Sequence, residues 1–434
     1  MYCLIMNEYY PRIADTILQE ELSSIGAVLL EGPKWCGKTS TSEQIAKSVL
    51  YMNNPKTKEI NKIIAQSDPE SLLIGDTPRL IDEWQIAADQ IWDTIRFTVD
   101  RRQAFGQFIL TGSATPQKIS KDTHSGTGRI KRMRMRTMSL FESGDSSGEI
   151  SLSSLFNENK SFSPIQTDGK LEKIAYLVCR GGWPMAVIAN SEKSALKQAN
   201  NYLDALLYQE IDGSSDDVLK LNPEWTKAIL RSYSRLIGTS ASCSVIYEDS
   251  MKHGNVSYSQ PTLENYLHHL NRLFVFEDLA AWNPNLRSRT AIRTSPTRYL
   301  TDPSVAAAAL GLGPGALIKD LKTFGFLFEN MAIRDFRTYG QSMGAQVYHY
   351  RDHNNLECDC VVVLPDGRYA LIEIKLGGKT LIDDGIKSLN KLESNLNTED
   401  MGKPAFKMVL CAVSPYAYMD PSGVIICPIT NLKN

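Results

Sequence analysis

A short segment at Gly32–Thr39 has the residue types and spacing of a phosphate-binding loop. It fits the pattern G-x-x-x-x-G-K-[ST], in which the glycines let backbone N–H groups face a phosphate and the lysine reaches the β and γ oxygens. We therefore predict that the loop binds ATP, with Lys38 on the phosphates and Thr39 as a ligand of Mg²⁺. The predicted nucleotide-binding residues are Gly32, Pro33, Lys34, Trp35, Cys36, Gly37, Lys38, Thr39 and Ser40.

Polar residues at the ends of two later strands complete this candidate nucleotide site. An apolar run leads into Asp82 and Glu83, and a second apolar run leads into Ser113. Asp82 suits the water shell of Mg²⁺, and Glu83 suits polarising the water that attacks the γ-phosphate. Ser113 is placed to contact the γ-phosphate or that water. The order of these residues after a phosphate-binding loop predicts ATP hydrolysis.

A second set of residues suited to chemistry lies near the C-terminus. Two apolar strands joined by the hairpin turn Pro365–Arg368 carry Asp359 on the first strand and Glu373 and Lys375 on the second. Strand periodicity places Glu373 and Lys375 on one face, and an upstream apolar helix carries Glu329. Asp359, Glu373 and Lys375, together with Glu329, have the side chains of a Mg²⁺-dependent phosphodiesterase. In such an enzyme the carboxylates hold the metal and the lysine orients or deprotonates water.

A structural interpretation of the same residues stays open. Glu373 and Lys375 can form an ion pair on a two-stranded ribbon while Asp359 faces solvent, which is common on such ribbons. Only a fold can show whether Glu329 reaches Asp359 across the intervening chain.

The segments around the phosphate loop alternate between patterns typical of strands and patterns typical of helices. This alternation predicts a parallel sheet with helices on both faces. The predicted strands are 27–31, 49–52, 79–83 and 107–113, and the predicted helices are 40–48, 56–66 and 88–102.

Two basic segments are candidates for contact with nucleic acid. Residues 129–136 alternate basic and apolar side chains, which fits a strand whose wet face contacts phosphates and fits a solvated strand equally. A second cluster lies near Trp282 and Tyr299, and arginine beside aromatic residues suits phosphate contacts and base stacking, although a solvated linker explains it as well. The arginines of this cluster are Arg287, Arg289, Arg293 and Arg298.

The middle of the chain has a different character. A stretch rich in Ser and Gly, 143–169, predicts an exposed loop or a mobile connection. Helical patterns follow to about residue 210, and residues 220–285 predict a small helical module that runs into a strand.

Composition is that of an ordinary globular protein. The length of 434 residues suggests about three domains. The formal net charge of −2 predicts no global attraction to nucleic acid, so any such binding must use local basic clusters. The 8 cysteines contain no CxxC pair and predict reduced thiols, and the absence of a long apolar run predicts a cytoplasmic protein without a membrane segment.

Seven motifs together carry a family resemblance. They are Tyr10–Arg12, Gly32–Thr39, Arg79–Gln85, Ile109–Ala114, Ser125–Arg129, Met138–Glu142 and Gly181–Pro184. Nearly the whole chain resembles bacterial and archaeal AAA+-type ATPases with a C-terminal domain of the DUF4143 type. In that family the middle segment looks like a winged helix and the C-terminal domain is similar to PD-(D/E)XK nucleases.

The resemblance implies an α/β fold with three domains. These are a parallel-sheet P-loop ATPase domain with a helical lid at 1–215, a winged-helix-like module at 216–299 and a nuclease-like domain at 300–434. It also implies that Arg129 contacts the γ-phosphate, either in its own chain or across the boundary of a homo-oligomer.

Two functional hypotheses follow. In the first, the protein is an ATPase whose cycle moves or licenses a C-terminal domain directed at double-stranded DNA. In the second, it is a slow nucleotide-controlled switch whose C-terminal domain only binds nucleic acid or a protein.

Overall fold

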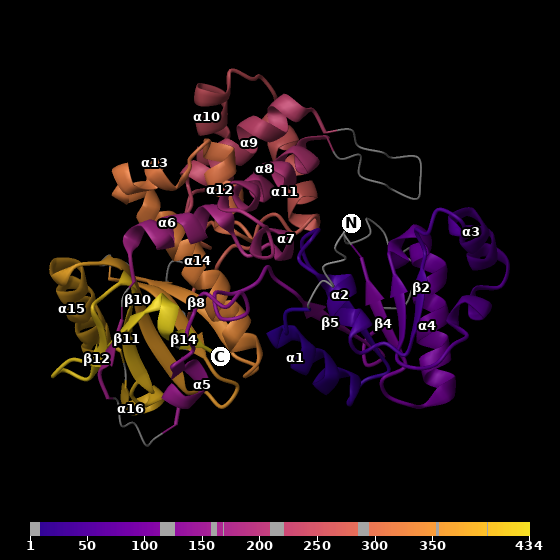
Figure 1. Ribbon diagram of the computed structural model, residues 1–434, viewed down its shortest axis with the longest axis horizontal. Helices are drawn as coiled ribbons and strands as arrows, with labels where there is room; N and C mark the ends of the chain where they lie inside the picture. Colours follow the sequence, from indigo (N-terminus) through magenta and orange to yellow (C-terminus); the bar gives the residue numbers. More distant parts are fainter. Residues whose placement is uncertain are drawn as a thin grey trace. The chain divides into compact units, whose positions relative to one another are not determined.

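The computed structural model describes residues 9–112, 126–157, 163–167, 169–208, 221–284, 295–352, 356–396 and 398–434. The chain divides into two units. The first is formed mainly by Met1–Thr137, and the second by Met138–Gln209, Leu221–Asn271 and Val275–Asn434. Figure 1 shows their elements.

The first unit is built on a five-stranded sheet in the order β2-β3-β4-β1-β5, with every neighbouring pair parallel. Ala27 lies opposite Phe108 on one side and Ile130 on the other, which fixes the register at the centre of the sheet. The parallel α/β sheet predicted from the alternating pattern is confirmed. The strands are β1 (Ala27–Glu31), β2 (Ser48–Tyr51), β3 (Arg79–Asp82), β4 (Phe108–Thr111) and β5 (Ile130–Arg134).

Successive residues of β1 enter two different hydrophobic cores because side chains alternate across a strand. Ala27 and Leu29 belong to the core beneath α3 and α4, whereas Val28 and Leu30 belong to the core beneath α1. The strand is therefore apolar throughout, as expected for a sheet covered on both faces. The helices of this unit are α1 (Ile13–Leu22), α2 (Lys38–Glu43), α3 (Lys58–Ser67) and α4 (Ala88–Arg102), with 3₁₀ turns η1 (Pro69–Leu73) and η2 (Trp84–Ala87).

The helix predicted over 40–48 is shorter and begins earlier, since α2 ends at Glu43 and β2 begins at Ser48. Ser and Thr compete for backbone hydrogen bonds and are weak helix formers, which accounts for the early end of this Ser- and Thr-rich segment.

The second unit contains a group of helices. Helix α9 packs against α10 and α12, and α6 packs against α12 and α13. Isolated antiparallel bridges follow α11, joining Phe276 to Leu300 and Leu279 to Thr297, and the winged-helix interpretation stays a prediction. The helices are α6 (Leu171–Arg180), α7 (Pro184–Val187), α8 (Glu192–Tyr208), α9 (Pro223–Arg235), α10 (Cys243–Gly254), α11 (Gln260–Arg272), α12 (Pro303–Leu310), α13 (Pro314–Lys319) and α14 (Leu321–Gln341).

A seven-stranded mixed sheet in the order β7-β12-β13-β11-β10-β9-β8 also belongs to this unit. The hairpin predicted around Pro365–Arg368 is confirmed, because Tyr369 of β10 lies opposite Val363 of β9 in an antiparallel pair. Helices α14 and α15 (Lys379–Asn395) both contact β9 and β10. The strands are β7 (Ile165–Gln166), β8 (Gln346–Arg351), β9 (Glu357–Val363), β10 (Tyr369–Gly377), β11 (Phe406–Val413), β12 (Tyr416–Met419) and β13 (Val424–Pro428).

The segment predicted as an exposed loop, 143–169, contributes to this unit instead. Its short strand β6 (Ile150–Ser151) pairs with β14 (Leu432–Lys433), α5 (Leu152–Leu155) follows β6, and β7 pairs with β12. The loop prediction is wrong for these elements because two-residue strands carry no readable periodicity. The remaining short elements are α16 (Thr398–Met401) and η3 (Ile429–Asn431).

The boundary between the units falls after Thr137, earlier than the predicted domain boundary at residue 215. That domain division stays a prediction. Within the described ranges, no helix combines the length and the apolar character needed to cross a bilayer.

Candidate functional site

The predicted phosphate-binding loop connects β1 to α2, at the carboxyl edge of the parallel sheet. Gly37 has a φ of 103°, a backbone conformation that favours glycine. A Cβ atom at Gly32 would lie 2.1 Å from the carbonyl oxygen of Met135, so only glycine fits there. Both glycines of the motif are thus required. Gly37 allows the backbone turn, and Gly32 allows the backbone of Met135 to approach closely.

Lys38 lies inside this loop. Its Nζ atom donates to the carbonyl oxygens of Gly32 and Pro33 at 2.9 and 2.8 Å, and the residue is 7% exposed. Nζ also lies 4.0 Å from Cys36 Sγ. A buried ammonium group beside neutral acceptors of this kind is suited to binding an anion. The donor set therefore fits a nucleotide phosphate.

Asp82 joins two hydroxyl groups at the edge where the phosphate loop lies. Its Oδ1 atom accepts from Thr39 Oγ1 at 2.9 Å and from Thr111 Oγ1 at 2.6 Å. Carboxylate and hydroxyl oxygens are the ligands that Mg²⁺ prefers, and the predicted pair Thr39 and Asp82 is brought together here. These residues fit the ion that accompanies a nucleotide.

Thr111 was not predicted as a site residue. It ends β4, two residues before Ser113, which lies outside the described residues. The only available signal was its position as the first polar residue after the apolar run of β4.

Glu83 follows β3 in an unusual backbone conformation. Its φ of 56° and ψ of 42° are left-handed, which costs a residue with a side chain about 1–3 kcal/mol. Its carboxylate accepts a hydrogen bond from Gln85 Nε2. Gln85 in turn lies against the end of β4, because a Cβ atom at Gly112 would be 2.4 Å from Gln85 Oε1. The strained residue is therefore hydrogen-bonded to a side chain that itself lies against the end of β4.

Two residues before α1 hold the phosphate loop in place, and sequence reasoning assigned neither of them a role. The Arg12 guanidinium donates to the carbonyl oxygens of Cys36 and Arg136, each at 2.9 Å, and Arg12 is 6% exposed. The Tyr9 hydroxyl lies 2.8 Å from Thr41 Oγ1 of α2. The motif Tyr10–Arg12 was the available signal, but it carried no chemistry of its own.

Arg129 is not brought to the phosphate loop. Because β5 runs parallel to β1 and Ile130 lies opposite Ala27, Arg129 precedes β5 at the amino edge, and the loop follows β1 at the other edge. Its guanidinium pairs with Asp100 of α4 at 2.8 Å. The predicted contact with the γ-phosphate of the same chain is therefore not formed, and only a contact with another subunit stays a prediction.

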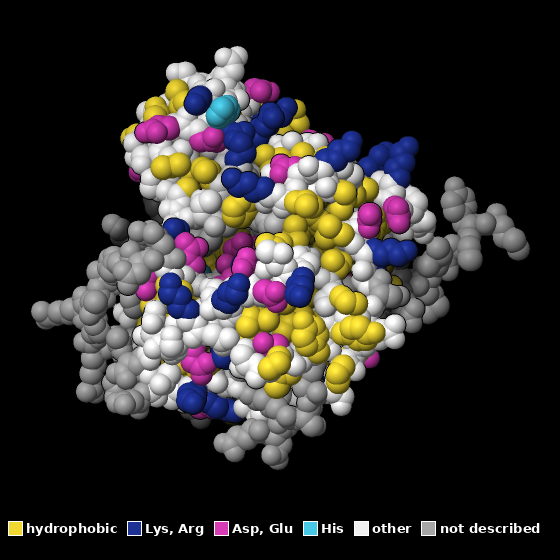
Figure 2. Space-filling model, turned by 90° about the vertical axis from the view of Figure 1, so that its left-hand side faces the viewer, with side chains coloured by type: hydrophobic (Ala, Val, Ile, Leu, Met, Phe, Trp, Pro, Cys, Tyr) yellow, Lys and Arg dark blue, Asp and Glu magenta, His cyan; other side chains and the backbone are white. Residues whose placement is uncertain are grey.

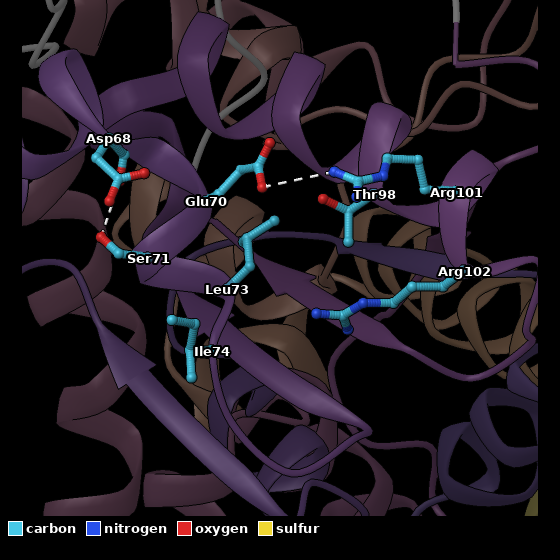
Figure 3. A pocket seen from close by; sticks show the side chains of 8 residues that line it. All are labelled: Asp68, Glu70, Ser71, Leu73, Ile74, Thr98, Arg101 and Arg102. Atoms are coloured by element: carbon cyan, nitrogen blue, oxygen red, sulfur yellow. Dashed lines mark hydrogen bonds and ion pairs between the residues drawn. The ribbon is translucent and has the colours of Figure 1, made fainter.

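A cavity of about 480 Å³ in the first unit is a separate feature (Figure 3). Its walls come from η1 and the end of α4, and Glu70 lies 4.0 Å from Arg101. Both segments lead into the amino ends of β3 and β4, whereas ligands of open α/β sheets bind at the carboxyl ends. The cavity is therefore distinct from the nucleotide site. It is lined by Asp68, Glu70, Ser71, Leu73, Ile74, Thr98, Arg101 and Arg102.

The acid and lysine residues predicted near the C-terminus do converge in the second unit. Lys375 Nζ lies 2.5 Å from Glu373 Oε2 and 3.1 Å from Asp359 Oδ2. Glu329 of α14 accepts a hydrogen bond from the hydroxyl of Tyr299 and interacts electrostatically with the other three residues. We call Glu329, Asp359, Glu373 and Lys375 the acid–lysine cluster.

Burial and mutual repulsion shift the proton equilibria of this cluster. Burial, and then the charge of Asp359, raises the pKa of Glu329 and that of Glu373 to about 8. Burial alone would lower the pKa of Lys375, but the carboxylates of Asp359 and Glu373 raise it above its ordinary value. Within the part of the chain that the structure describes, no group of three or more acid, His or Cys side chains is arranged to hold a metal ion.

The predicted arginine cluster near Trp282 is described only at Arg298. Its guanidinium donates to Asp278 Oδ2 at 2.5 Å and to the carbonyl oxygen of Ala241 at 2.8 Å. Arg298 therefore makes hydrogen bonds within the second unit, which use its guanidinium group. Arg287, Arg289 and Arg293 lie outside the described residues.

Family models match three segments of the chain. Residues 25–143 match an AAA domain, residues 171–316 match a domain of unknown function, DUF8612, and residues 324–432 match another domain of unknown function, DUF4143. The resemblance to AAA-type ATPases with a C-terminal DUF4143 domain is confirmed.

Full-length relatives are distant. Two uncharacterised proteins, one from Mycobacterium bovis and one from Mycobacterium tuberculosis, are each 23% identical over 394 residues, which is 89% of this chain and 78% of each relative. A solved structure of Drosophila ORC bound to DNA matches with a TM-score of 0.19 and 11% identity, over 68% of this chain and 84% of that chain. A similarity this weak carries no argument about fold or function.

Proposed function

We propose that this chain, which joins an AAA domain to a DUF4143 domain, binds ATP with Mg²⁺ at the loop Gly32–Thr39 and hydrolyses it. Hydrolysis controls the activity of the second unit toward double-stranded DNA. Glu83 polarises the attacking water, and Lys38 binds the phosphates.

One observation carries this proposal. Asp82 gathers the hydroxyl groups of Thr39 and Thr111 beside a loop whose lysine is buried against the carbonyls of Gly32 and Pro33. Thr39 and Asp82 would hold Mg²⁺, which neutralises phosphate charge when it is bound. The strained backbone of Glu83 supports a functional role, because such strain clusters at active sites.

We propose DNA as a partner because of local groups of Lys and Arg side chains, since the net charge of the chain is close to zero. On the face drawn in Figure 2, several Lys and Arg side chains lie close together over the upper part, with acidic and apolar side chains among them. In the first unit, β5 presents the exposed residues Lys131 and Arg132, which already pair with Glu21 and Glu31. Binding through such clusters should weaken as salt is raised, with a slope set by the number of phosphates that the protein neutralises.

Steady-state ATP hydrolysis, measured with and without double-stranded DNA, tests the proposal. We expect turnover in wild-type protein, stimulation by DNA, and loss of both in Glu83→Gln, which keeps the shape of the side chain and removes its charge. The variant should still bind a fluorescent ATP analogue with wild-type affinity. Hydrolysis that is unchanged in Glu83→Gln would reject the role of Glu83.

The alternative is a nucleotide-controlled switch with slow turnover. It predicts tight ATP binding with negligible hydrolysis whether or not DNA is present, and it would direct the search to a protein partner. Hydrolysis that rises more than linearly with protein concentration would instead indicate a homo-oligomer, in which Arg129 can act on a neighbouring subunit.

A further inference from the structure

Within the acid–lysine cluster, a lysine stands where a metal-dependent phosphodiesterase needs its cation. The amine of Lys375 lies between two carboxylates, 2.5 Å from Glu373 Oε2 and 3.1 Å from Asp359 Oδ2. An ammonium group at these distances neutralises the same oxygens that a divalent cation would use.

The carboxylate oxygens of the cluster also have other donors. Asp359 Oδ2 accepts from the backbone N–H of Ile374 at 2.7 Å, and Glu373 Oε1 accepts from Ser388 Oγ at 3.0 Å. Glu329 Oε1 accepts from the hydroxyl of Tyr299, which is fully buried. A metal ion would have to compete with a lysine, a backbone amide and two hydroxyl groups.

The charge of Lys375 points the same way. Its ammonium group is paired with Asp359 and with Glu373, so these two carboxylates are already partly neutralised. A cluster that holds its own cation offers less attraction to Mg²⁺ or Mn²⁺.

We infer that Lys375 takes the place of a divalent cation in this cluster, so that the protein binds no metal there and the cluster joins α14 to strands β9 and β10. The second unit then recognises its partner without cleaving it by a metal-dependent route. This inference goes beyond the proposed function, since it concerns the second unit alone and requires no nucleotide.

A specific consequence follows for a variant without the amine. Lys375→Met keeps most of the aliphatic stem but leaves the carboxylates of Asp359 and Glu373 with no cation between them. Two carboxylates in that position repel one another, and a divalent cation between them would relieve this repulsion. The variant should therefore gain a divalent metal site that the parent protein lacks.

Binding of Mn²⁺, followed by the electron paramagnetic resonance signal of the free ion, tests this consequence on the full chain without nucleotide. All proteins carry Asp82→Asn, which removes the carboxylate of the other candidate metal site. We expect Lys375→Met to bind one Mn²⁺ at least about tenfold more tightly than its parent, a difference of about 1.4 kcal/mol. Lys375→Arg, which keeps the positive charge, should resemble the parent, and Asp359→Asn combined with Lys375→Met should lose the gained site.

Two results would overturn the inference. One is stoichiometric Mn²⁺ binding by the parent that disappears in Asp359→Asn. The other is a folded Lys375→Met variant that binds no more Mn²⁺ than the parent. If Lys375→Met does not fold by circular dichroism, Lys375→Gln supplies the same comparison with a polar side chain.

Discussion

Single residues at the two sites show how position within the fold changes their chemistry. Lys38 and Lys375 are both largely enclosed lysines, but their acceptors differ. The described acceptors of Lys38 include the neutral carbonyls of Gly32 and Pro33, whereas Lys375 is paired with two carboxylates. The first lysine keeps a charge that an anion can use, and the charge of the second is already neutralised.

Glu329 gives the clearest pH prediction. Its folded-state pKa of about 8 lies above its ordinary value of 4.5, so the folded protein holds a proton that the unfolded chain releases between these values. The stability contributed by this proton is fully present below pH 4.5 and is lost as pH rises toward 8. Glu329→Gln imitates the protonated acid and removes this loss.

Glu329→Gln should therefore gain stability relative to wild type as pH rises from 5.5 to 8.5, by up to about 1.4 kcal/mol for each pH unit below pH 8. Urea unfolding at several pH values measures the difference between the two proteins. Glu357→Gln is a matched control on β9, because the Glu357 side chain is half exposed and pairs with Arg351 at the surface. A difference between Glu329→Gln and wild type that is the same at every pH would mean that Glu329 stays charged throughout.

At the scale of elements, Arg12 links the start of α1 to the phosphate loop and to the segment after β5. Its two donors reach Cys36 O and Arg136 O at 2.9 Å each. A lysine would not reproduce both contacts in this geometry, because Arg12 uses two separate nitrogens of a planar guanidinium fork whereas an ammonium is a compact point charge. Arg12 is thus a positioning residue for the loop.

Arg12→Lys should weaken ATP binding by roughly tenfold without unfolding the protein, since loss of one charged hydrogen bond costs about 1.5–3 kcal/mol and only part of this loss reaches the ligand. Titration with a fluorescent ATP analogue measures the affinity. Arg132→Lys is the control, because Arg132 is exposed on β5 and pairs with the side chain of Glu31 rather than with a backbone carbonyl of the loop. Equal affinities for the two variants would exclude a positioning role for Arg12.

The elements also show what sequence patterns could predict. The alternation of apolar and helical segments predicted the parallel sheet, because each strand of a sheet covered on both faces must be apolar throughout. Patterns could not predict that Arg129 lies at the amino edge of the sheet, since that position follows from the parallel pairing of β1 with β5. They also missed β6 and β7, whose pairing with strands near the C-terminus depends on contacts distant in sequence.

How well each candidate site could be predicted also depended on whether its residues are close together in the sequence. Gly32–Thr39 is contiguous, so its motif specifies the loop directly. Residue types identified the acid–lysine cluster, but the contact of Lys375 with both Asp359 and Glu373 depends on how β9 and β10 pair. Arg12 was overlooked because its role lies in backbone contacts that no side-chain pattern encodes.

At the scale of the whole molecule, each of the two units has a hydrophobic core made of its own residues. The cores of the first unit include Leu29 of β1 and Leu110 of β4, and a core of the second includes Leu371 of β10 and Val409 of β11. A ligand that binds one unit stabilises that unit by mass action and leaves an independent unit unchanged.

ATP with Mg²⁺ should therefore slow hydrogen exchange in the first unit only. At a ligand concentration about 100 times the dissociation constant, the expected stabilisation is about 2.7 kcal/mol, which slows exchange limited by unfolding of that unit by roughly 100-fold. Mass spectrometry of peptides from β1 and β4, compared with peptides from β10 and β11, measures both units in one experiment.

Lys38→Ala provides the control, because it removes the amine from the phosphate loop and should abolish the nucleotide effect in β1 and β4. Equal slowing in β10 and β11 would show that the two cores unfold as one cooperative unit. Slowing that persists in Lys38→Ala would place the nucleotide outside the loop Gly32–Thr39. Protection that is confined to β1 and β4, and is lost in Lys38→Ala, would locate ATP in the first unit. The second unit would then respond to ATP by moving, because its core is not stabilised.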